Sequence, residues 1–209
     1  MTKVKICGIT NLDDALAACD AGADALGFVF AEEARARNRY IEPERAASIV
    51  AQLPPFVTVV AVCVNASAEQ LVEYLSFAHY VQLCGEETVE DYTAVAARAI
   101  KVFHEGPDFA MEGMAAHPAR AYLLDAQAGG AHGGTGTTCD WASARKATAI
   151  GKPMILAGGL TPENVAEAVR LVHPYAVDTS GGVEASPGKK DHERLRTFIR
   201  TAKSAVSVS

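Results

Sequence analysis

Three residues with reactive side chains stand at the ends of short apolar runs. Cys7 ends the run VKIC, Asp125 ends AYLLD and Asp178 ends YAVD. A cysteine acts as a base or nucleophile through its thiolate, and a partly buried carboxyl group has a raised pKa that suits a general acid. Taken alone, Cys7 is equally a small buried hydrophobe, and Asp125 is equally a cap or turn residue. Cys7 and Asp125 together predict acid–base chemistry if the fold brings them to one place.

Two glycine-containing segments follow later apolar runs. LAGGLTPENV places Gly158 and Gly159 between a predicted strand and a predicted helix, and DTSGG places Ser180 and Gly181 after the next strand. Glycine lets the backbone approach a ligand closely, and N–H groups at a helix start bind phosphate. A tight turn is the alternative for either segment alone. The two segments together predict a phosphate site.

A group of basic residues follows the second predicted strand. Arg35, Arg37 and Arg39 alternate with other residues in this segment. A solvated loop is the default interpretation of such a group. Arginine is also a two-point partner for a carboxylate, so the segment is a candidate site for an acidic substrate.

The segment AQAGGAHGGTGTTCDW, directly after Asp125, is rich in glycine. Its composition predicts a loop that can fold over a ligand. We expect His132 within it to be a solvated loop residue, and Cys139 to pack or to lie at the rim of the site.

Apolar runs alternate with segments of helical periodicity along the chain. Runs without alternation indicate strands buried on both faces, and Leu12, Leu16 and Cys19 share one predicted helical face. Strands are predicted at residues 4–9, 25–30, 58–64, 80–83, 99–103, 121–124, 153–157 and 175–179. Helices are predicted at residues 12–21, 43–53, 68–77, 89–97, 141–148, 162–172 and 191–205, with Ser67 and Thr161 as N-caps.

Eight strands that alternate with helices predict an α/β protein with a parallel sheet covered by helices. A single-domain (β/α)8 TIM barrel over residues 1–209 is favoured, and a doubly wound open sheet is the alternative. No GxGxxG follows the first strand, where a dinucleotide-binding open sheet would have one. With 209 residues the barrel is compact, and we expect an abbreviated or irregular fifth helix and frayed last residues.

In a barrel the carboxyl ends of all strands meet at one mouth, where active sites form. The first and eighth strands are then neighbours, and Lys5 shares the inward phase of Cys7. We therefore expect an ion pair between Lys5 and Asp178 below the site. An ammonium group near Cys7 favours the thiolate form.

Composition limits the class of protein and its partners. Lys and Arg number 19 against 25 Asp and Glu, for a net charge of −6, and 49% of the residues are hydrophobic. We expect a soluble globular protein that binds neither nucleic acid nor membrane surfaces, since both need a basic face. No apolar run is long enough to span a membrane, and MTKVKICGIT lacks signal-peptide features. Five cysteines without metal-like spacing predict reduced thiols in a cytoplasmic protein.

Eight segments, in order along the whole chain, resemble the phosphoribosylanthranilate isomerase family of tryptophan biosynthesis. KICGIT and GGTGTTCDW are the specific ones, because glycine turns occur in many phosphate-binding barrels. The segments are KICGIT (5–10), GADALGFVF (22–30), VQLCGEE (81–87), LLDA (123–126), GGTGTTCDW (133–141), LAGGLTPENV (156–165), VDTSGGVE (177–184) and PGKKD (187–191).

The resemblance implies an aldose–ketose isomerase without metal or other cofactor. The reaction is the Amadori rearrangement of N-(5-phosphoribosyl)anthranilate to 1-(2-carboxyphenylamino)-1-deoxyribulose 5-phosphate. Cys7 is implied as the general base that removes the proton from ribose C2, and Asp125 as the general acid that opens the ring. Arg39 is implied as the partner of the anthranilate carboxylate. Arg37 stays an alternative, because Arg37-Asn38 stands where the family has Ser-Pro.

The resemblance also implies where the rest of the substrate lies. The phosphate is expected on Gly158, Gly159, Ser180 and Gly181, with Asp178 near the ribose hydroxyls and Lys5 as its support. The partner is a small-molecule substrate, and the protein is expected to be a monomer or a homodimer.

The sequence departs from the family pattern at two cysteines. Cys84 stands where histidine is common, and Cys139 where phenylalanine is common, but neither change removes the implied acid or base. Another sugar-phosphate barrel, such as an epimerase or the related histidine-pathway isomerase, would need a carboxylate on the first strand or paired metal ligands. Cys7 stands there instead. A non-catalytic phosphate-binding module is predicted to lack the base or the acid, and both are present.

Overall fold

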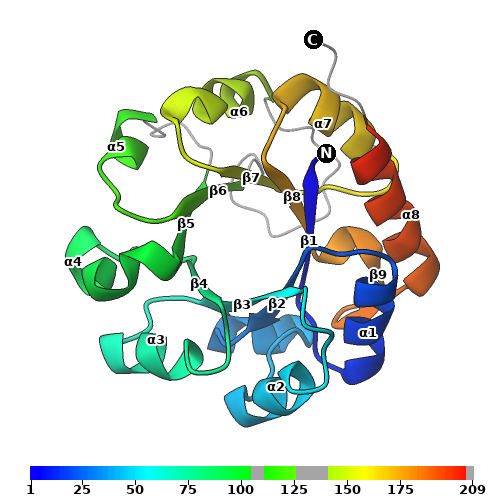
Figure 1. The fold of residues 1–209 in the computed structure, drawn as a ribbon, viewed down its shortest axis with the longest axis horizontal. Helices are drawn as coiled ribbons and strands as arrows, with labels where there is room; N and C mark the ends of the chain where they lie inside the picture. Colours follow the sequence, from blue (N-terminus) through cyan, green and yellow to red (C-terminus); the bar gives the residue numbers. More distant parts are fainter. Residues whose placement is uncertain (105–110, 126–140, 206–209) are drawn as a thin grey trace.

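Eight parallel strands form a closed barrel. In the computed structural model, which describes residues 1–104, 111–125 and 141–205, the strands follow one another in chain order and β8 pairs with β1 (Figure 1). The predicted (β/α)8 barrel is confirmed, and the open sheet is wrong because an open sheet would leave β1 and β8 unpaired. The strands are β1 (Lys3–Cys7), β2 (Ala25–Val29), β3 (Thr58–Cys63), β4 (Tyr80–Leu83), β5 (Ala99–His104), β6 (Ala121–Asp125), β7 (Met154–Ala157) and β8 (Ala176–Thr179).

Helices surround the barrel on its outer side (Figure 1). They are α1 (Leu12–Asp20), α2 (Pro43–Val50), α3 (Ala68–Tyr74), α4 (Val89–Tyr92), α5 (Met111–Ala115), α6 (Trp141–Ala147), α7 (Val165–Val172) and α8 (His192–Ser204). Short 3-10 helices are η1 (Glu32–Arg37), η2 (Thr93–Arg98), η3 (Thr148–Ile150) and η4 (Gly181–Val183). After β8 the chain also forms an antiparallel hairpin of β9 (Glu184–Ser186) and β10 (Lys189–Lys190), which the sequence did not predict.

Local sequence explains where several helices begin. Pro43 occupies the first turn of α2, where its missing N–H costs nothing. Ser67 caps α3, as predicted, and forms a capping box with Gln70. Asp191 caps α8 by accepting the N–H groups of Glu193 and Arg194.

Four helices differ from the predicted ones by three or more residues, and two of them, α2 and α3, end at Val50 and Tyr74, three residues earlier than predicted. Residues 162–164 form a turn, so α7 begins at Val165 after Asn164, and Thr161 is not its N-cap. Thr161 Oγ1 instead accepts the N–H of Glu163, because a threonine hydroxyl can stabilise a turn as readily as a helix start. The predicted helix 89–97 is divided into α4 and the tighter η2.

The fifth unit of the barrel is short, as predicted. Its helix α5 contains 5 residues. The predictions for His132, for Cys139 and for the glycine-rich loop after Asp125 lie outside the described residues, as does the fraying of residues 206–209.

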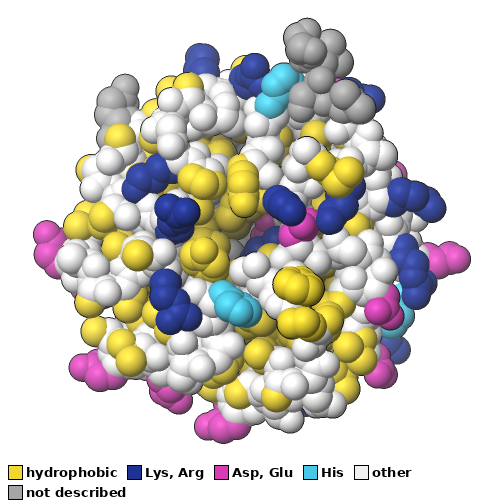
Figure 2. All heavy atoms as spheres, viewed as in Figure 1, with side chains coloured by type: hydrophobic (Ala, Val, Ile, Leu, Met, Phe, Trp, Pro, Cys, Tyr) yellow, Lys and Arg dark blue, Asp and Glu magenta, His cyan; other side chains and the backbone are white. Residues whose placement is uncertain are grey.

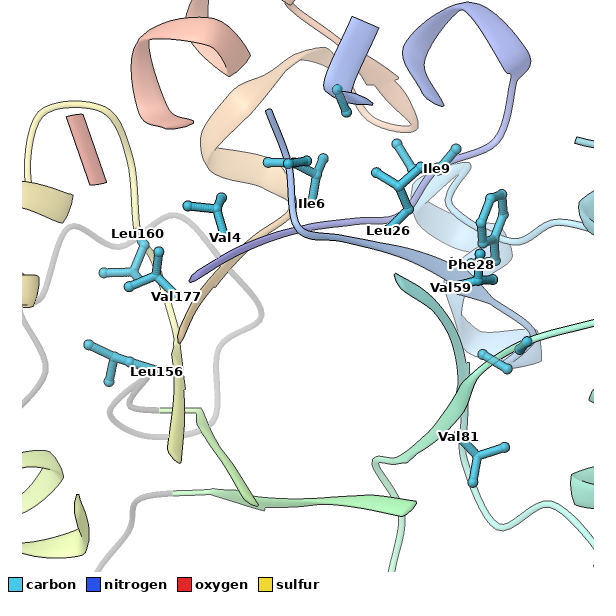
Figure 3. Close-up of a cluster of buried hydrophobic side chains, with 14 of the residues drawn as sticks. Val4, Ile6, Ile9, Leu26, Phe28, Val59, Val81, Leu156, Leu160 and Val177 are labelled. Atoms are coloured by element: carbon cyan, nitrogen blue, oxygen red, sulfur yellow. The ribbon is translucent and has the colours of Figure 1, made fainter. Parts of the chain in front are cut away.

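The barrel has apolar side chains on both faces of its wall. Val4, Ile6, Leu26 and Phe28 pack between the sheet and the helices, on the outer side of the ring of strands (Figure 3). Successive side chains of a strand point to opposite faces, so their neighbours fill the lumen. The buried apolar residues of the lumen are Cys7, Val60, Val62, Ile100, Val102, Ala121, Leu123, Ile155, Ala157 and Ala176.

The outer surface combines charged and apolar side chains. Figure 2 shows acidic side chains mainly at the edge of one face, with basic and apolar side chains also nearer its centre. Of the predicted apolar face of α1, Leu12 and Cys19 pack against the core, whereas Leu16 is 37% exposed and is wrongly predicted. The helix also packs through the small side chains of Ala15 and Ala18. Among the described residues, no helix has both the length and the apolar character needed to cross a membrane.

Candidate active site

The barrel brings Cys7 and Asp125 to the same mouth. Cys7 is the last residue of β1, and Asp125 is the last residue of β6. Cys7 belongs to the lumen cluster, and Asp125 stands two residues after Leu123, which also belongs to it. Because side chains two residues apart share a face, both point toward the lumen at its carboxyl end. Asp125 is partly exposed, so a ligand in the mouth can reach it, whereas Cys7 is 8% exposed.

Lys5 and Asp178 form an ion pair inside the lumen. Lys5 Nζ lies 2.9 Å from Asp178 Oδ1, and the two side chains are 4% and 10% exposed. They are register partners on β1 and β8, so the predicted pair is confirmed. Burial lowers the pKa of Lys5, but the Asp178 carboxylate and Cys7 outweigh burial and raise the pKa above its usual value. Lys5 is therefore a fixed positive charge.

Gly27 on β2 gives this charge room beside Cys7. A Cβ at Gly27 would lie 2.9 Å from Cys7 Sγ and 3.1 Å from Lys5 Nζ. Both distances are shorter than ordinary van der Waals contact, so a larger residue would displace one of the two groups. The Cys7 sulfur and the Lys5 ammonium group therefore both lie against the backbone of Gly27.

Arg39 lies over the mouth, between the ends of β1 and β8. A Cβ at Gly181 would lie 2.8 Å from Arg39 Nη2, and one at Gly8 would lie 3.4 Å from Arg39 Cδ. The Nε and Nη2 groups donate to the two carboxylate oxygens of Glu184 at 2.9 and 2.7 Å. Arg35, by contrast, pairs with exposed glutamates. Arg39 is thus an arginine of the basic segment that reaches the mouth.

Glu184 also binds Lys190, whose side chain is fully buried. Lys190 Nζ donates to Glu184 Oε1 at 3.1 Å. Burial raises the pKa of Glu184, but Arg39 and Lys190 outweigh burial and hold that pKa below its usual value. The sequence pattern predicts no role for Glu184 or Lys190. The available signal was the Pro-Gly pair between them, which is typical of a turn.

The loops after β7 and β8 pack against each other. Thr179 Oγ1 donates to the carbonyl oxygen of Leu160 at 2.7 Å, and a Cβ at Gly182 would collide with the same oxygen. Gly158 and Gly159 have φ angles of 98° and 61°, which glycine adopts without strain. The two predicted phosphate segments therefore form one continuous surface.

Ser180 contributes a hydroxyl to this surface. Its Oγ is buried and has no hydrogen-bond partner in the part of the chain that the structure describes. It lies 2.8 Å from where a Cβ at Gly8 would be, so it faces the end of β1. A buried hydroxyl without a partner is costly, and an anion that accepts a hydrogen bond from it would remove that cost.

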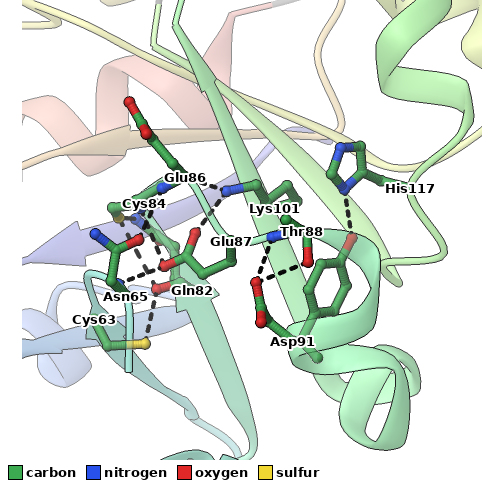
Figure 4. Close-up of polar contacts among 12 residues, drawn as sticks. Cys63, Asn65, Gln82, Cys84, Glu86, Glu87, Thr88, Asp91, Lys101 and His117 are labelled. Carbon is green, nitrogen blue, oxygen red and sulfur yellow. Dashed lines mark hydrogen bonds and ion pairs between the residues drawn. The ribbon is translucent and has the colours of Figure 1, made fainter. Parts of the chain in front are cut away.

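Another buried ion pair lies outside the lumen, near the loop after β4. Lys101 Nζ donates to Glu87 Oε2 at 2.6 Å and to the carbonyl oxygen of Gly85 at 2.7 Å (Figure 4). Glu87 Oε1 accepts the N–H groups of Asn65 and Gly85 at 2.8 and 3.1 Å. Lys101 alternates with the lumen residues Ile100 and Val102, so it points toward the helices. This network fixes the loops after β3 and β4.

Cys84 follows β4 and packs against the lumen cluster. Its sulfur accepts a hydrogen bond from Gln82 Nε2 at 3.4 Å. Burial is the main cause that raises the pKa of the Cys84 thiol to about 12. Cys84 is therefore a neutral thiol at physiological pH and a poor base.

His104 is a rim residue that sequence reasoning missed. It is the register partner of Asp125 on β5, and it stands two residues after Val102 of the lumen cluster. Extending the alternation of β5 by one residue would have found it. Among the described residues, no group of three or more His, Cys, Asp or Glu is placed to hold a metal ion.

A family model, sequence relatives and solved structures all match this chain to one family. The family model for N-(5'-phosphoribosyl)anthranilate (PRA) isomerase matches residues 4–201. The chain is 50% identical to the N-(5'-phosphoribosyl)anthranilate isomerase of Pelobacter propionicus over 212 residues, covering 100% of this chain and 99% of the relative. The Geobacter sulfurreducens enzyme is also 50% identical, with 97% and 99% covered.

Solved structures agree with the sequence relatives. The crystal structure of phosphoribosylanthranilate isomerase from Thermotoga maritima has a TM-score of 0.88 and 43% identity, covering 97% of this chain and 99% of that one. A second solved isomerase, in complex with reduced 1-(o-carboxyphenylamino)-1-deoxyribulose 5-phosphate, has a TM-score of 0.84 and 42% identity over the same shares. The chain therefore belongs to the N-(5'-phosphoribosyl)anthranilate isomerase family.

Proposed function

We propose that this chain converts N-(5'-phosphoribosyl)anthranilate to 1-(2-carboxyphenylamino)-1-deoxyribulose 5-phosphate, an isomerisation in tryptophan biosynthesis. The observation that carries the proposal is the placement of Cys7 and Asp125, which point toward one lumen mouth in a member of this family. An acid and a base at one mouth match a reaction that moves protons and leaves the atom count unchanged.

The first step opens the furanose ring. Asp125 donates its proton to the ring oxygen while the C1–O bond breaks, and the anthranilate nitrogen forms a protonated C=N bond with C1. This role requires Asp125 to hold a proton before the step, and the end of β6 places its side chain at the lumen mouth. Asp125 becomes a carboxylate in this step.

The second step removes the proton from C2. Cys7 takes it as a thiolate, and the electron pair of the C2–H bond forms a C1=C2 bond as the C=N bond accepts electrons. The resulting enol then gives the ketone by gaining a proton at C1 and losing the hydroxyl proton at C2. The fixed positive charge of Lys5 lies beside the Cys7 sulfur, and Asp178 keeps Lys5 in place and lies near the ribose hydroxyls.

The two anionic ends of the substrate bind at different parts of the mouth. Arg39 holds the anthranilate carboxylate, which its position over the mouth supports. The phosphate binds the surface formed by the loops after β7 and β8, through Gly158, Gly159, Ser180 and Gly181. The buried unpartnered hydroxyl of Ser180 supports this placement. No metal or cofactor takes part.

The proposal includes the setting of the enzyme. Its partner is this small molecule and not a nucleic acid or a membrane, and it acts in the cytoplasm as a monomer or homodimer. The related Thermotoga maritima enzyme is described as dimeric, and monomers have been generated from it. An epimerase with a carboxylate on the first strand is disfavoured, because Cys7 occupies that position.

A fluorescence assay tests the proposal directly. Phosphoribosylanthranilate is added to chelator-treated protein, and the loss of its fluorescence is followed. We expect a rate proportional to the protein concentration and unchanged by the chelator. Fluorescence that decays at the same rate with and without protein would overturn the proposed function.

A further inference from the structure

We infer that Glu184 is a positioning residue for Arg39 and that Lys190 sets the charge of the pair, so that the three side chains act as one carboxylate-binding unit. The inference deepens the proposed function and rests on its assignment of the substrate carboxylate to Arg39. Arg39, Glu184 and Lys190 are called the mouth triad below.

Glu184 fixes the plane of the Arg39 guanidinium. Two parallel hydrogen bonds join Nε and Nη2 to the two oxygens of one carboxylate, at 2.9 and 2.7 Å. Such a pair sets both the distance and the orientation of the guanidinium, which a single bond does not. The Glu184 side chain is only 6% exposed, so it cannot swing into solvent as a surface glutamate does.

One edge of the guanidinium remains for a ligand. Arg39 Nη1 has no hydrogen-bond partner within the described residues, while Nε and Nη2 are taken by Glu184. The Arg39 side chain is 21% exposed, so a ligand can reach it. Nη1, and the Nη2 hydrogen that Glu184 does not use, can bind a second carboxylate without breaking the first pair.

Lys190 gives the mouth triad a net positive charge. Arg39 and Glu184 alone would cancel, and an arginine neutralised in this way attracts an anion weakly. Lys190 Nζ lies 3.1 Å from Glu184 Oε1 and 3.2 Å from the carbonyl oxygen of Ser180, and its side chain is 0% exposed. Burial lowers the pKa of Lys190, and the Glu184 carboxylate opposes that shift. The triad has one positive charge when Lys190 is protonated, which matches one carboxylate.

The β9–β10 hairpin holds the mouth triad together. Gly188, in its turn, has a φ of 80° and lies so close to the carbonyl oxygen of Asn38 that a Cβ would collide with it. Thr10 Oγ1 donates to the Gly188 carbonyl oxygen at 2.8 Å, and the Lys190 N–H donates to Asp14 at 2.9 Å. The hairpin is thus anchored beside the residue that precedes Arg39. Glu184 and Arg39 therefore meet through the packing of the backbone.

Binding of two matched ligands tests this role. The first is the reduced carboxyphenylamino-deoxyribulose phosphate found in the related structure, and the second is the same compound without its ring carboxyl group. Dissociation constants are measured by calorimetry for the wild type and for Glu184→Gln. We expect Glu184→Gln to raise the dissociation constant of the carboxylated ligand about tenfold, which is the value of one misplaced charged hydrogen bond. The dissociation constant of the ligand without the carboxyl group should change by less than about twofold.

The sign of the effect is informative, because Glu184→Gln removes a negative charge. Electrostatics alone would tighten anion binding, so weaker binding identifies loss of position. Carboxylated ligand bound as tightly as by the wild type, or more tightly, would overturn the inference. Equal weakening of both ligands would also overturn it, since that result indicates a general disturbance of the mouth.

Further variants complete the test. Glu32→Gln is the matched control, because Glu32 also pairs with an arginine, Arg35, but on the exposed surface. It should change neither dissociation constant. If Glu184→Gln does not fold, Glu184→Asp keeps the charge, shortens the bridge and should show the same selectivity. Wild-type protein that binds neither ligand would overturn the proposed function together with the inference, whereas binding by the wild type with no selective loss overturns the inference alone.

Discussion

Two buried lysine–carboxylate pairs lie on opposite faces of the barrel wall. Lys5 and Asp178 pair inside the lumen at 2.9 Å, and Lys101 and Glu87 pair between the sheet and the helices at 2.6 Å. All four side chains are at least nine-tenths buried. The two pairs therefore have the same chemistry and nearly the same burial.

Their surroundings differ. Lys101 and Glu87 also bind the backbone of the loops after β3 and β4, through a carbonyl oxygen of Gly85 and N–H groups of Asn65 and Gly85. The lumen pair lies instead beside the thiol of Cys7, with Gly27 leaving room for both groups. An ion pair satisfied by backbone groups holds loops in place, and one left beside a reactive side chain can act on that side chain.

The largest effects are expected from the groups beside the lumen pair. Cys7→Ala and Asp125→Asn should each lower kcat at least about a hundredfold, the usual contribution of one acid–base group. Both proteins should stay folded, as followed by circular dichroism. Cys63→Ala is the matched control, because Cys63 is buried on the outer face of β3 and should leave kcat unchanged. Turnover close to the wild type in both Cys7→Ala and Asp125→Asn would rule out the proposed mechanism.

Breaking the two ion pairs tests the comparison itself. Lys5→Met and Lys101→Met each leave a buried carboxylate without its lysine, and each should lower the free energy of unfolding by about 3–5 kcal/mol in urea titrations. At a temperature where both variants are folded, only Lys5→Met should also lower kcat, by about tenfold to a hundredfold. Equal losses of kcat in the two variants would show that the lumen pair has no special role.

The sequence predicts the lumen pair and misses the outer pair, for a physical reason. Lys5 and Asp178 lie on strands, where side-chain phase and the order of strands around a closed barrel determine which residues meet. Glu87 lies in a loop, and its meeting with Lys101 depends on the path of that loop. Which face of the sheet a strand residue occupies does not determine the path of a loop.

The same distinction separates the correct and wrong parts of the predicted fold and site. The eight strands, the closed barrel and the short fifth helix follow from apolar runs and their number. The β9–β10 hairpin that binds Arg39 does not, because its two strands are too short to show a periodic pattern. Helical spacing groups Leu16 with Leu12 and Cys19, whereas α1 approaches the barrel through Ala15, Ala17 and Ala18.

A smaller change tests the close packing on the lumen side. Gly27→Ala would place a Cβ 2.9 Å from Cys7 Sγ and 3.1 Å from Lys5 Nζ, so one group must move. We expect the free energy of unfolding to fall by about 1–3 kcal/mol, the usual cost of overpacking, together with a lower kcat. The control is Gly113→Ala in α5, where a Cβ meets nothing within 4 Å. It should stabilise the protein by up to about 1 kcal/mol. Wild-type kcat in Gly27→Ala would show that sulfur and ammonium can move apart at no cost to the reaction.

The smallest expected effect concerns how the free energy of unfolding depends on pH, which differs between the Lys5–Asp178 and Lys101–Glu87 pairs. Burial raises the pKa of Glu87, but Lys101 and the N–H of Asn65 outweigh burial and hold it below the usual 4.5. Glu87 therefore stabilises the fold above about pH 4.5, and this stabilisation is lost as the pH falls through the folded pKa. Lys5 has a raised pKa, so its contribution is complete below about pH 10.5 and is lost as the pH rises through the folded value. In urea titrations across pH, Glu87→Gln should flatten the acid side of the stability curve and Lys5→Met the alkaline side. An acid slope in Glu87→Gln equal to that of the wild type would mean that the outer pair adds nothing to acid stability.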